Sequence, residues 1–216
     1  MHNGYINVDN HKMSKSLNNF FTVREVAERY GYEPIRYLMV ASHYRSPINY
    51  SMEIMEQCKA GLERLYHCRE NLEFQLSHAG SEENPQEAAW RERFQTHREH
   101  FLAAMDDDLN TADALSALFD LAKDINTTVT AANAPSAEFC RFALGLFGEL
   151  ADVLGLLYAK KEQSLDEEIE ALIAQRTKAR AEKDWATADR IRDELKARNI
   201  VLEDTPQGIK WKIMAD

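Results

Sequence analysis

The chain has 216 residues and a formal net charge of −10 at pH 7, because 36 Asp and Glu residues outnumber 26 Lys and Arg residues. Its 8 Gly and 5 Pro residues amount to about half of the usual share, which excludes collagen-like, linker-dominated and turn-rich all-β designs. With 44% hydrophobic and 29% charged residues, the chain can bury a core without disulfide or metal staples. We therefore expect a mainly α-helical globular protein of one or two domains.

No segment predicts export or membrane insertion. The most apolar stretch, residues 144–159, is interrupted by Gly148, Glu149, Asp152 and Gly155, so it falls short of the roughly 20 uninterrupted apolar residues of a membrane span. The first dozen residues are polar, unlike a signal peptide. Cys58, Cys68 and Cys140 are odd in number and lie in helical patterns, which predicts buried, reduced thiols. These features favour a cytoplasmic protein.

The first fifty residues read as a loop followed by short helices. Thr22 and Glu25 have the spacing of a capping box, and the helix that they begin ends at Gly31. Pro34 suits the first position of the next helix. Residues 43–50 break the helical pattern, which ends this first segment at residue 50.

Four longer stretches with a helical apolar period follow between residues 51 and 162. The first begins at Ser51, which is a suitable N-cap, and the fourth follows Pro135. Their apolar stripes include Met55, Cys58, Leu62, Leu65, Leu72 and Leu76; Trp90, Phe94, His97, Phe101 and Ala104; Leu115, Leu118, Phe119, Ala122, Ile125 and Val129; and Phe139, Phe142, Leu146, Leu150, Val153 and Leu157. Short connections between amphipathic helices predict an antiparallel bundle over residues 51–162.

A small α+β domain is predicted over residues 163–216. The charged stretch 160–168 suits a linker, and two helical patterns follow it. At Ile200 the apolar period changes from 3.6 to 2, and the Thr-Pro-Gln-Gly stretch at 205–208 predicts the turn of a terminal β-hairpin.

Positive charge is concentrated in two zones of this acidic chain. Residues 169–216 hold ten Lys and Arg against nine Asp and Glu, and residues 10–46 hold six against three. Any phosphate-binding function is therefore expected in these zones.

A cluster of cations and hydroxyls, Lys12-Met13-Ser14-Lys15-Ser16, lies in the zone 10–46. A lysine is a compact charge on a mobile stem, and the serine hydroxyls add short-range donors, so these residues suit a flexible anion clamp. Two lysines three residues apart also fit an ordinary solvated loop.

The complete pentapeptide resembles the signature loop of class I aminoacyl-tRNA synthetases, and the stretch after it, residues 17–24, resembles the cysteinyl-tRNA synthetases. Further stretches similar to that family follow in order: His-Tyr-Arg-Ser-Pro-Ile-Asn-Tyr-Ser at 43–51, Asp-Asp-Leu-Asn-Thr at 107–111, and a terminal run from Trp185 to Trp211. Asn18 departs from the family, which usually has Gly there, although Asn tolerates a left-handed backbone.

The resemblance implies a cysteine–tRNA ligase, which activates cysteine with ATP and magnesium and transfers it to tRNA(Cys). Lys15 would contact the departing pyrophosphate, and Lys12, Met13, Ser14 and Ser16 would complete the ATP-binding loop. Because the attacking carboxylate of cysteine is already ionised, catalysis requires alignment and charge stabilisation rather than a general base.

Anticodon recognition would fall to residues 163–216, and tRNA binding to the bundle as well. Reading a GCA anticodon requires acceptors for the donors of guanine and donors for the carbonyl of cytosine, which Asp and Arg supply. Arg180, Asp189, Asp204 and Trp211 are the candidate tRNA-binding residues. Trp185 and Trp211 could stack on bases, although aromatic residues in such positions are more often core. The charged residues could instead form ordinary surface pairs, such as Asp189 with Arg192.

The family's HIGH-type ATP signature and its Cys/His/Glu zinc site belong to a Rossmann-type catalytic domain that precedes the signature loop. Neither is found in this sequence, so we expect no zinc ligands here and no other metal site. The chain thus resembles the C-terminal half of the enzyme. The expected partners are the N-terminal catalytic domain of the same enzyme and tRNA(Cys), and the expected state is a monomer.

Other polar groups have competing interpretations. The acidic run 106–108 could bind a metal, but a solvated turn before a helix capped by Asn110 is favoured. His97 and His100 share a helical face and could bind a metal, but no third ligand is evident, so a metal site is disfavoured. Contact with a tRNA acceptor stem and pairing within the fold remain open for four residues: Arg36, His43, Tyr44 and Arg45.

Two rival functions compete with this hypothesis. A related ligase joins cysteine to an amino-sugar inositol and carries a similar loop, but the terminal hairpin argues against it. A free-standing tRNA-binding or helical interaction module without catalysis is the other. Gel-shift binding with tRNA(Cys) and a second tRNA separates tRNA binding from protein binding.

The 216-residue chain alone is predicted not to form cysteinyl-adenylate, because the ATP cradle and the thiol-sensing metal site of the family are missing from it. The purified chain should therefore show no cysteine-dependent exchange between pyrophosphate and ATP. Exchange above the level of a cysteine-free control would contradict this prediction.

Overall fold

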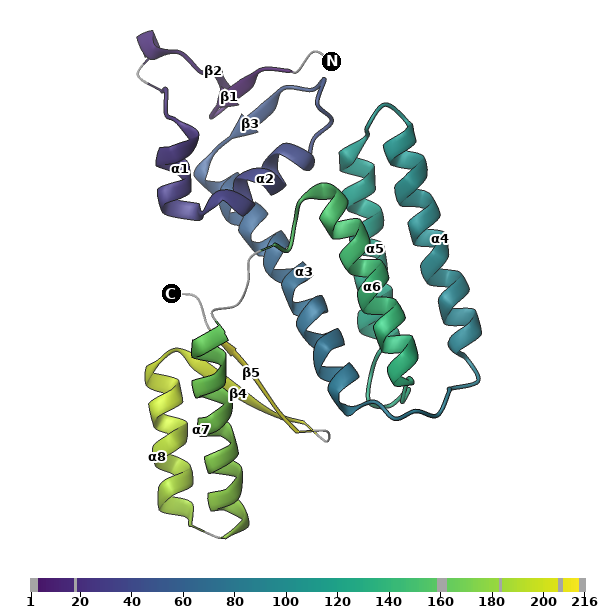
Figure 1. Cartoon of the computed structure of the whole chain (residues 1–216). Helices are drawn as coiled ribbons and strands as arrows, with labels where there is room; N and C mark the ends of the chain where they lie inside the picture. Colours follow the sequence, from purple (N-terminus) through teal and green to yellow (C-terminus); the bar gives the residue numbers. More distant parts are fainter. Residues whose placement is uncertain (1–3, 18, 159–162, 183, 206–207, 214–216) are drawn as a thin grey trace. The chain divides into compact units, whose positions relative to one another are not determined.

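The computed structural model of the chain describes residues 4–17, 19–158, 163–182, 184–205 and 208–213, and most of them are helical, as the sequence predicts (Figure 1). The chain packs as two compact units, Met1–Tyr158 and Ala159–Asp216. The division into functional domains at 1–50, 51–162 and 163–216 stays a prediction, since packing alone does not show where a function begins.

A three-stranded sheet lies near the N-terminus, where the sequence analysis expected only a loop. Strand β1 (Ile6–Val8) pairs antiparallel with β2 (His11–Lys12) and parallel with β3 (Ile48–Tyr50). Asp9 and Asn10 form the two-residue hairpin turn with φ values of 48° and 62°. Strands of two or three residues are too short for an alternating pattern to reveal them, which is why the prediction was wrong.

Two short helices connect this sheet to the rest of the unit. Helix α1 (Val23–Tyr30) has the predicted capping box: Glu25 N donates to Thr22 Oγ1, and Thr22 N donates to the Glu25 carboxylate at 2.6 Å. These bonds with Thr22 lower the pKa of Glu25. Helix α2 (Tyr32–Val40) follows Gly31 directly and begins two residues before Pro34, so its predicted start was wrong. Pro34 is tolerated because N–H groups of a first turn have no helical acceptor.

The predicted bundle is formed by α3 (Met52–His78), α4 (Glu87–Asp106), α5 (Thr111–Thr128) and α6 (Ala137–Leu154), which lie side by side in Figure 1. Ser51, Asn110 and Ser136 each cap a helix by accepting from the N–H three residues on. Val153, predicted on the apolar stripe, is 53% exposed, and its neighbour Leu154 is buried instead. The largest fully buried side chains come from all four helices: Met55, Leu65, Leu72, Phe94, Phe101, Leu118, Leu121, Ile125, Phe139, Phe147, Leu150 and Leu154.

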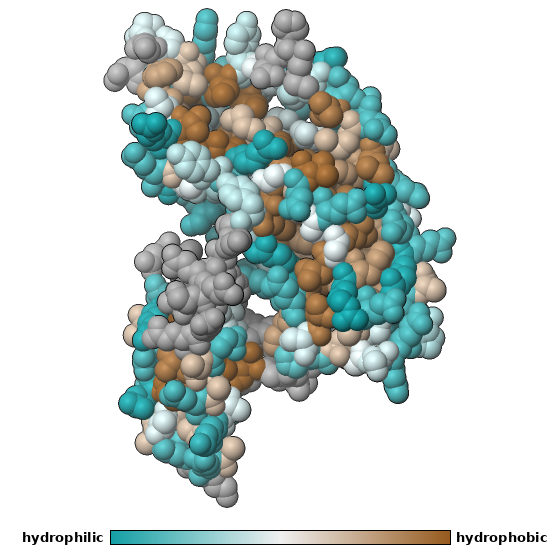
Figure 2. All heavy atoms as spheres, viewed as in Figure 1, coloured by the Kyte–Doolittle hydropathy of each residue, from teal (hydrophilic) through white to brown (hydrophobic). Residues whose placement is uncertain are grey.

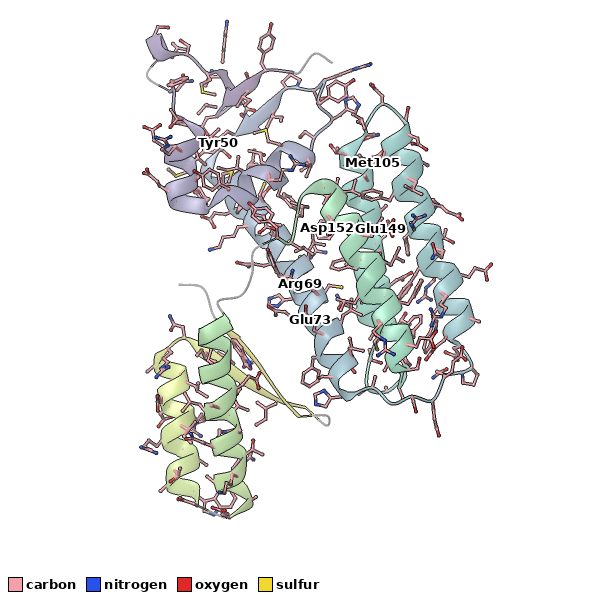
Figure 3. The ribbon with its side chains drawn as sticks, viewed as in Figure 1. Tyr50, Arg69, Glu73, Met105, Glu149 and Asp152 are labelled. Atoms are coloured by element: carbon pink, nitrogen blue, oxygen red, sulfur yellow. The ribbon has the colours of Figure 1, made fainter. Side chains whose placement is uncertain are left out.

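Polar side chains fix the segment that follows α6. Leu157 N donates to the buried carboxylate of Glu33 on α2, and Leu157 O accepts from Arg69 Nη1 at 2.7 Å. Arg36 Nε donates to Leu154 O at 2.8 Å. Arg69 lies on α3 beside Glu73 (Figure 3). Helix α2 is thereby joined to the end of the bundle.

The second unit contains the predicted pair of helices and the hairpin. Helices α7 (Gln163–Ala181) and α8 (Trp185–Ala197) pack on each other, and β4 (Ile200–Thr205) pairs antiparallel with β5 (Gly208–Ile213). Residues 206–207 of the predicted turn and residues 159–162 of the predicted linker lie outside the described residues. No helix in the described segments is long and apolar enough to cross a bilayer. The hydrophobic core of the second unit consists of Ile169, Ile173, Ile191, Leu195 and Ile200.

Glu87 is a fully buried carboxylate at the start of α4. It accepts from Ser136 N at 2.6 Å, from Ser136 Oγ at 2.8 Å and from Asn84 N at 3.1 Å. A buried charge requires such donors to offset the loss of water. The two bonds from Ser136 tie the start of α4 to the start of α6, and the bond from Asn84 N is local to the start of α4.

Replacing Glu87 by Ala should destabilise the bundle by about 3 kcal/mol, because the donors on Ser136 and Asn84 then lose a buried charged acceptor. Urea unfolding followed by circular dichroism measures the loss. Glu138→Ala is the matched control, because that side chain is 81% exposed and pairs with Arg91 at the surface. Equal unfolding free energies for the two variants would contradict the role given to Glu87.

Candidate functional site

The signature loop, Lys12–Ser16, begins at the end of β2 and enters a turn of 3-10 helix, η1 (Lys15–Leu17). Lys12 and Ser16 are exposed, and Met13 and Ser14 are half-buried. The Lys15 backbone belongs to η1, but its side chain lies outside what the structure describes, as does all of Asn18. The structure therefore places Lys12, both hydroxyls and the Lys15 backbone in one short, solvent-facing turn.

Asn19 closes this loop on itself. Its Oδ1 accepts from Ser14 N at 2.9 Å, and its Nδ2 donates to Lys12 O at 3.2 Å. The hydroxyl oxygens of Ser14 and Ser16 are 2.6 Å apart. Asn19 was not among the residues predicted for the site. Its signal in the sequence is its side-chain amide, which can both accept from a backbone N–H and donate to a backbone C=O in a turn.

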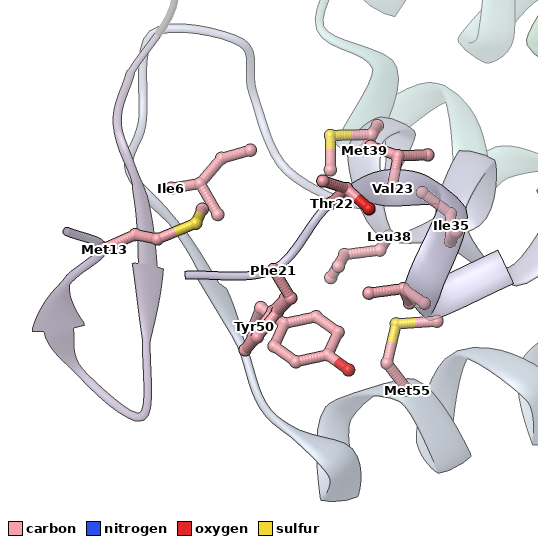
Figure 4. Close-up of a pocket in the computed structure, with 11 residues that line it drawn as sticks. Ile6, Met13, Phe21, Thr22, Val23, Ile35, Leu38, Met39, Tyr50 and Met55 are labelled. Carbon is pink, nitrogen blue, oxygen red and sulfur yellow. The ribbon is translucent and has the colours of Figure 1, made fainter. Parts of the chain in front are cut away.

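Met13 supports the loop by apolar packing. It lines an apolar cavity of about 60 Å³ together with Ile6, Phe21, Met39 and other residues of α1, α2, β3 and α3 (Figure 4). Figure 2 shows hydrophobic side chains at the surface around these N-terminal elements, where Leu17 is 62% exposed. The loop is thus anchored by its methionine while its polar groups face solvent.

The residues with two open interpretations are paired within the fold. Tyr44 Oη donates to Asp108 Oδ1 at 2.8 Å, and Arg45 Nη2 lies 2.8 Å from Asp108 Oδ2. His43 Nε2 lies 3.8 Å from the same oxygen, and Arg36 is bonded to the end of α6. These contacts favour structural pairing over contact with an acceptor stem. The acidic residues 106–108 are exposed just before the helix that Asn110 caps, as predicted, and Asp108 also pairs within the fold.

His97, considered above together with His100 as a metal ligand, is bonded to Asp124. Its Nε2 lies 2.8 Å from Asp124 Oδ2, which Arg93 Nε also approaches at 2.9 Å. Within the described ranges, no three His, Cys, Asp or Glu side chains could hold a metal ion together. The zinc that the resemblance implies therefore has no fitting ligand set there.

The cysteines are buried thiols, as predicted, and none of the three is in a disulfide. Burial raises the pKa values of Cys58, Cys68 and Cys140 to about 11, 12 and 11. Each thiol is consequently protonated at neutral pH and is a poor metal ligand or nucleophile.

The two tryptophans of the second unit differ from each other. Trp185 is 59% exposed at the first position of α8, so the prediction that it lies in the core was wrong. It comes about one turn before Ala188, the first buried residue of this helix. Trp211 packs against the apolar cluster, and its Nε1 donates to Glu170 Oε1 at 2.8 Å. The structure favours a packing role for Trp211.

Two of the charged candidates, Arg180 and Asp189, lie at the surface of this unit. Asp189 Oδ1 lies 3.1 Å from Arg192 Nη1, which is the surface pair that was the alternative interpretation. Both side chains are more than half exposed, and such pairs are weak in water. Trp185, Asp189 and Arg192 are spaced four and three residues apart and share one face of α8. Arg180 is exposed near the end of α7, and the Asp204 side chain lies outside the described residues.

Three family models match the chain in order: the tRNA synthetases class I (C) catalytic domain at residues 1–60, the DALR domain at 100–158, and the Cysteinyl-tRNA ligase anticodon binding domain at 162–211. The chain belongs to the class I aminoacyl-tRNA synthetases. The three matches and their order are consistent with the C-terminal part of cysteinyl-tRNA synthetase.

A solved structure with a similar fold is that of the Agrobacterium radiobacter K84 LeuRS, in a ternary complex with tRNA and LeuAMS. The TM-score is 0.51 at 19% sequence identity, over 72% of this chain. The match spans only 22% of the LeuRS chain. At this identity the likeness shows the fold alone.

Asn19→Ala should open the signature loop, because Ser14 N then loses its acceptor. The Ser14 amide should exchange with solvent about tenfold faster, as measured by NMR. Asn19→Asp is the matched control, since its carboxylate can still accept from Ser14 N. Unchanged exchange in Asn19→Ala would show that the loop is held closed by other contacts.

Proposed function

We propose that this chain supplies the signature loop and the tRNA-binding part of a cysteine–tRNA ligase, which activates cysteine with ATP and transfers it to tRNA(Cys). The observation that carries the proposal is the match of residues 162–211 to the Cysteinyl-tRNA ligase anticodon binding domain. The turn at Lys12–Ser16, closed by Asn19, supports it. The likeness to LeuRS concerns the fold alone and favours no other amino acid.

In the proposed activation step the carboxylate of cysteine attacks the α-phosphorus of ATP, and the bond to pyrophosphate breaks. The charge that develops on the departing pyrophosphate is neutralised by Lys15, with Lys12 and the Ser14 and Ser16 hydroxyls beside it. Magnesium enters with ATP as part of the substrate. The loop geometry supports this assignment, because Asn19 gathers Lys12 and both serines into one turn.

Anticodon recognition is assigned to the second unit, where Arg180, Asp189 and Asp204 are the proposed base contacts. An acidic chain cannot attract a polyanion through its overall field, so it requires local contacts to unpaired bases. A carboxylate repels phosphate and helps only by accepting from a base. The exposed Trp185 ring on the same face of α8 as Asp189 adds a surface on which a base can stack.

Lys15→Ala, in the enzyme that carries this chain together with its catalytic domain, should slow adenylate formation about 100-fold. Cysteine affinity should change far less, because the charge of Lys15 matters most when pyrophosphate departs. Single-turnover kinetics measure the rate. Lys123→Ala, at an exposed lysine on α5, is the control. An unchanged activation rate for Lys15→Ala would remove Lys15 from the mechanism.

Asp189→Ala and Asp204→Ala should each reduce discrimination between tRNA(Cys) and an anticodon-substituted tRNA(Cys) about tenfold, because a base donor loses a charged acceptor. General tRNA affinity should fall less. Asp193→Ala is a matched control on α8, since Asp193 is also exposed beside Arg192. Binding is measured at one fixed salt concentration. If both variants keep the wild-type ratio, the anticodon is read elsewhere.

A further inference from the structure

One carboxylate joins the turn between α4 and α5 to the segment before β3. Asp108 accepts the Tyr44 hydroxyl on Oδ1 and pairs with Arg45 on Oδ2, both at 2.8 Å. Arg45 Nε also donates to Tyr44 Oη at 3.1 Å, and the Tyr44 ring stacks on His43 with centroids 4.7 Å apart. We call Asp108, Tyr44 and Arg45 the Asp108 clasp. Its members brace one another, which an isolated surface pair does not.

The backbone that presents Asp108 is strained. Asp108 and Leu109 both have φ values of 55°, a left-handed conformation that costs free energy in residues other than glycine. Leu109 is 43% exposed, so burial of its side chain does not account for this conformation. The turn is also joined to the same segment by Thr111 Oγ1, which donates to Ser42 O at 3.5 Å. The fold thus maintains an unfavourable backbone at the point where the clasp forms.

From the clasp, backbone hydrogen bonds continue to the strand that precedes the signature loop. Gly4 N donates to Tyr44 O at 2.7 Å, and Ile48 N donates to Tyr5 O at 2.8 Å. A Cβ atom on Gly4 would lie 2.3 Å from Ser46 O, so the two segments are in close contact. Residues 4–5 lead into β1, and β1 pairs with β2, which ends at Lys12.

We propose that Asp108 is a positioning residue for the signature loop. Through Tyr44 and Arg45 it fixes the N-terminal sheet to the helical bundle, so that the loop is presented from a frame that belongs to the bundle. Asp108 itself touches no reacting group. The consequence for catalysis rests on the proposed function, whereas the anchoring of the sheet does not.

The anchoring is tested in the 216-residue chain by NMR hydrogen exchange of the Gly4 and Ile48 amides. Asp108→Gly keeps a left-handed backbone accessible and removes the carboxylate, so both amides should exchange about fivefold to tenfold faster. Tyr44→Phe removes one hydroxyl and should give a smaller increase. Asp107→Ala, at the exposed neighbouring carboxylate, should leave both rates unchanged. If the Gly4 and Ile48 amides of Asp108→Gly exchange at the same rates as in the wild type, the proposal is overturned.

The catalytic consequence is tested in the enzyme that includes the catalytic domain. Asp108→Gly should lower the rate of adenylate formation about fivefold to tenfold and leave the KM for cysteine within about twofold, because a displaced loop affects alignment rather than substrate binding. Faster exchange with an unchanged rate of adenylate formation would overturn the positioning role. Faster exchange in a protein whose wild type shows no cysteine-dependent activity would support the anchoring and count against the proposed function instead.

Discussion

The burial of four apolar helix faces against one another is the interaction on which the first unit depends. Helices α3–α6 form a core of fully buried Phe, Leu, Ile and Met side chains, and most of the stabilising free energy of such a bundle comes from removing these groups from water. The N-terminal elements add a smaller apolar cluster around Leu38 and Met55. Polar contacts then fix their position, such as the bond of 2.7 Å from Tyr66 Oη to the buried Glu33 carboxylate.

This arrangement separates stability from function within the unit. The bundle is rigid because its side chains are close-packed, whereas the signature loop keeps its shape through a few hydrogen bonds of Asn19 at the surface. In the proposed function this loop follows a rearranging polyphosphate, which requires mobile cations on a fixed backbone. Met13, which lines the apolar cavity, fixes that backbone. The Asp108 clasp extends the rigid frame towards the loop without placing an acidic group in it.

Long periodic elements could be predicted from the sequence, and contacts between distant segments could not. The bundle helices and the cap at Ser51 follow from local pattern and local chemistry, as does the terminal hairpin. The parallel pairing of β1 with β3 joins residues about forty positions apart and leaves no local signal. The exposure of Trp185 depends on where the core of its unit ends, and the partners of Asp108 depend on tertiary packing, so spacing alone predicts neither.

Recognition of tRNA by an acidic chain must depend on base contacts more than on charge, and that makes specificity directly measurable. The affinity of the 216-residue chain for tRNA(Cys) and for tRNA(Leu), compared at one fixed salt concentration, is the decisive quantity. The proposed function predicts binding of tRNA(Cys) at least about tenfold tighter. Equal affinities, or tighter binding of tRNA(Leu), would contradict it.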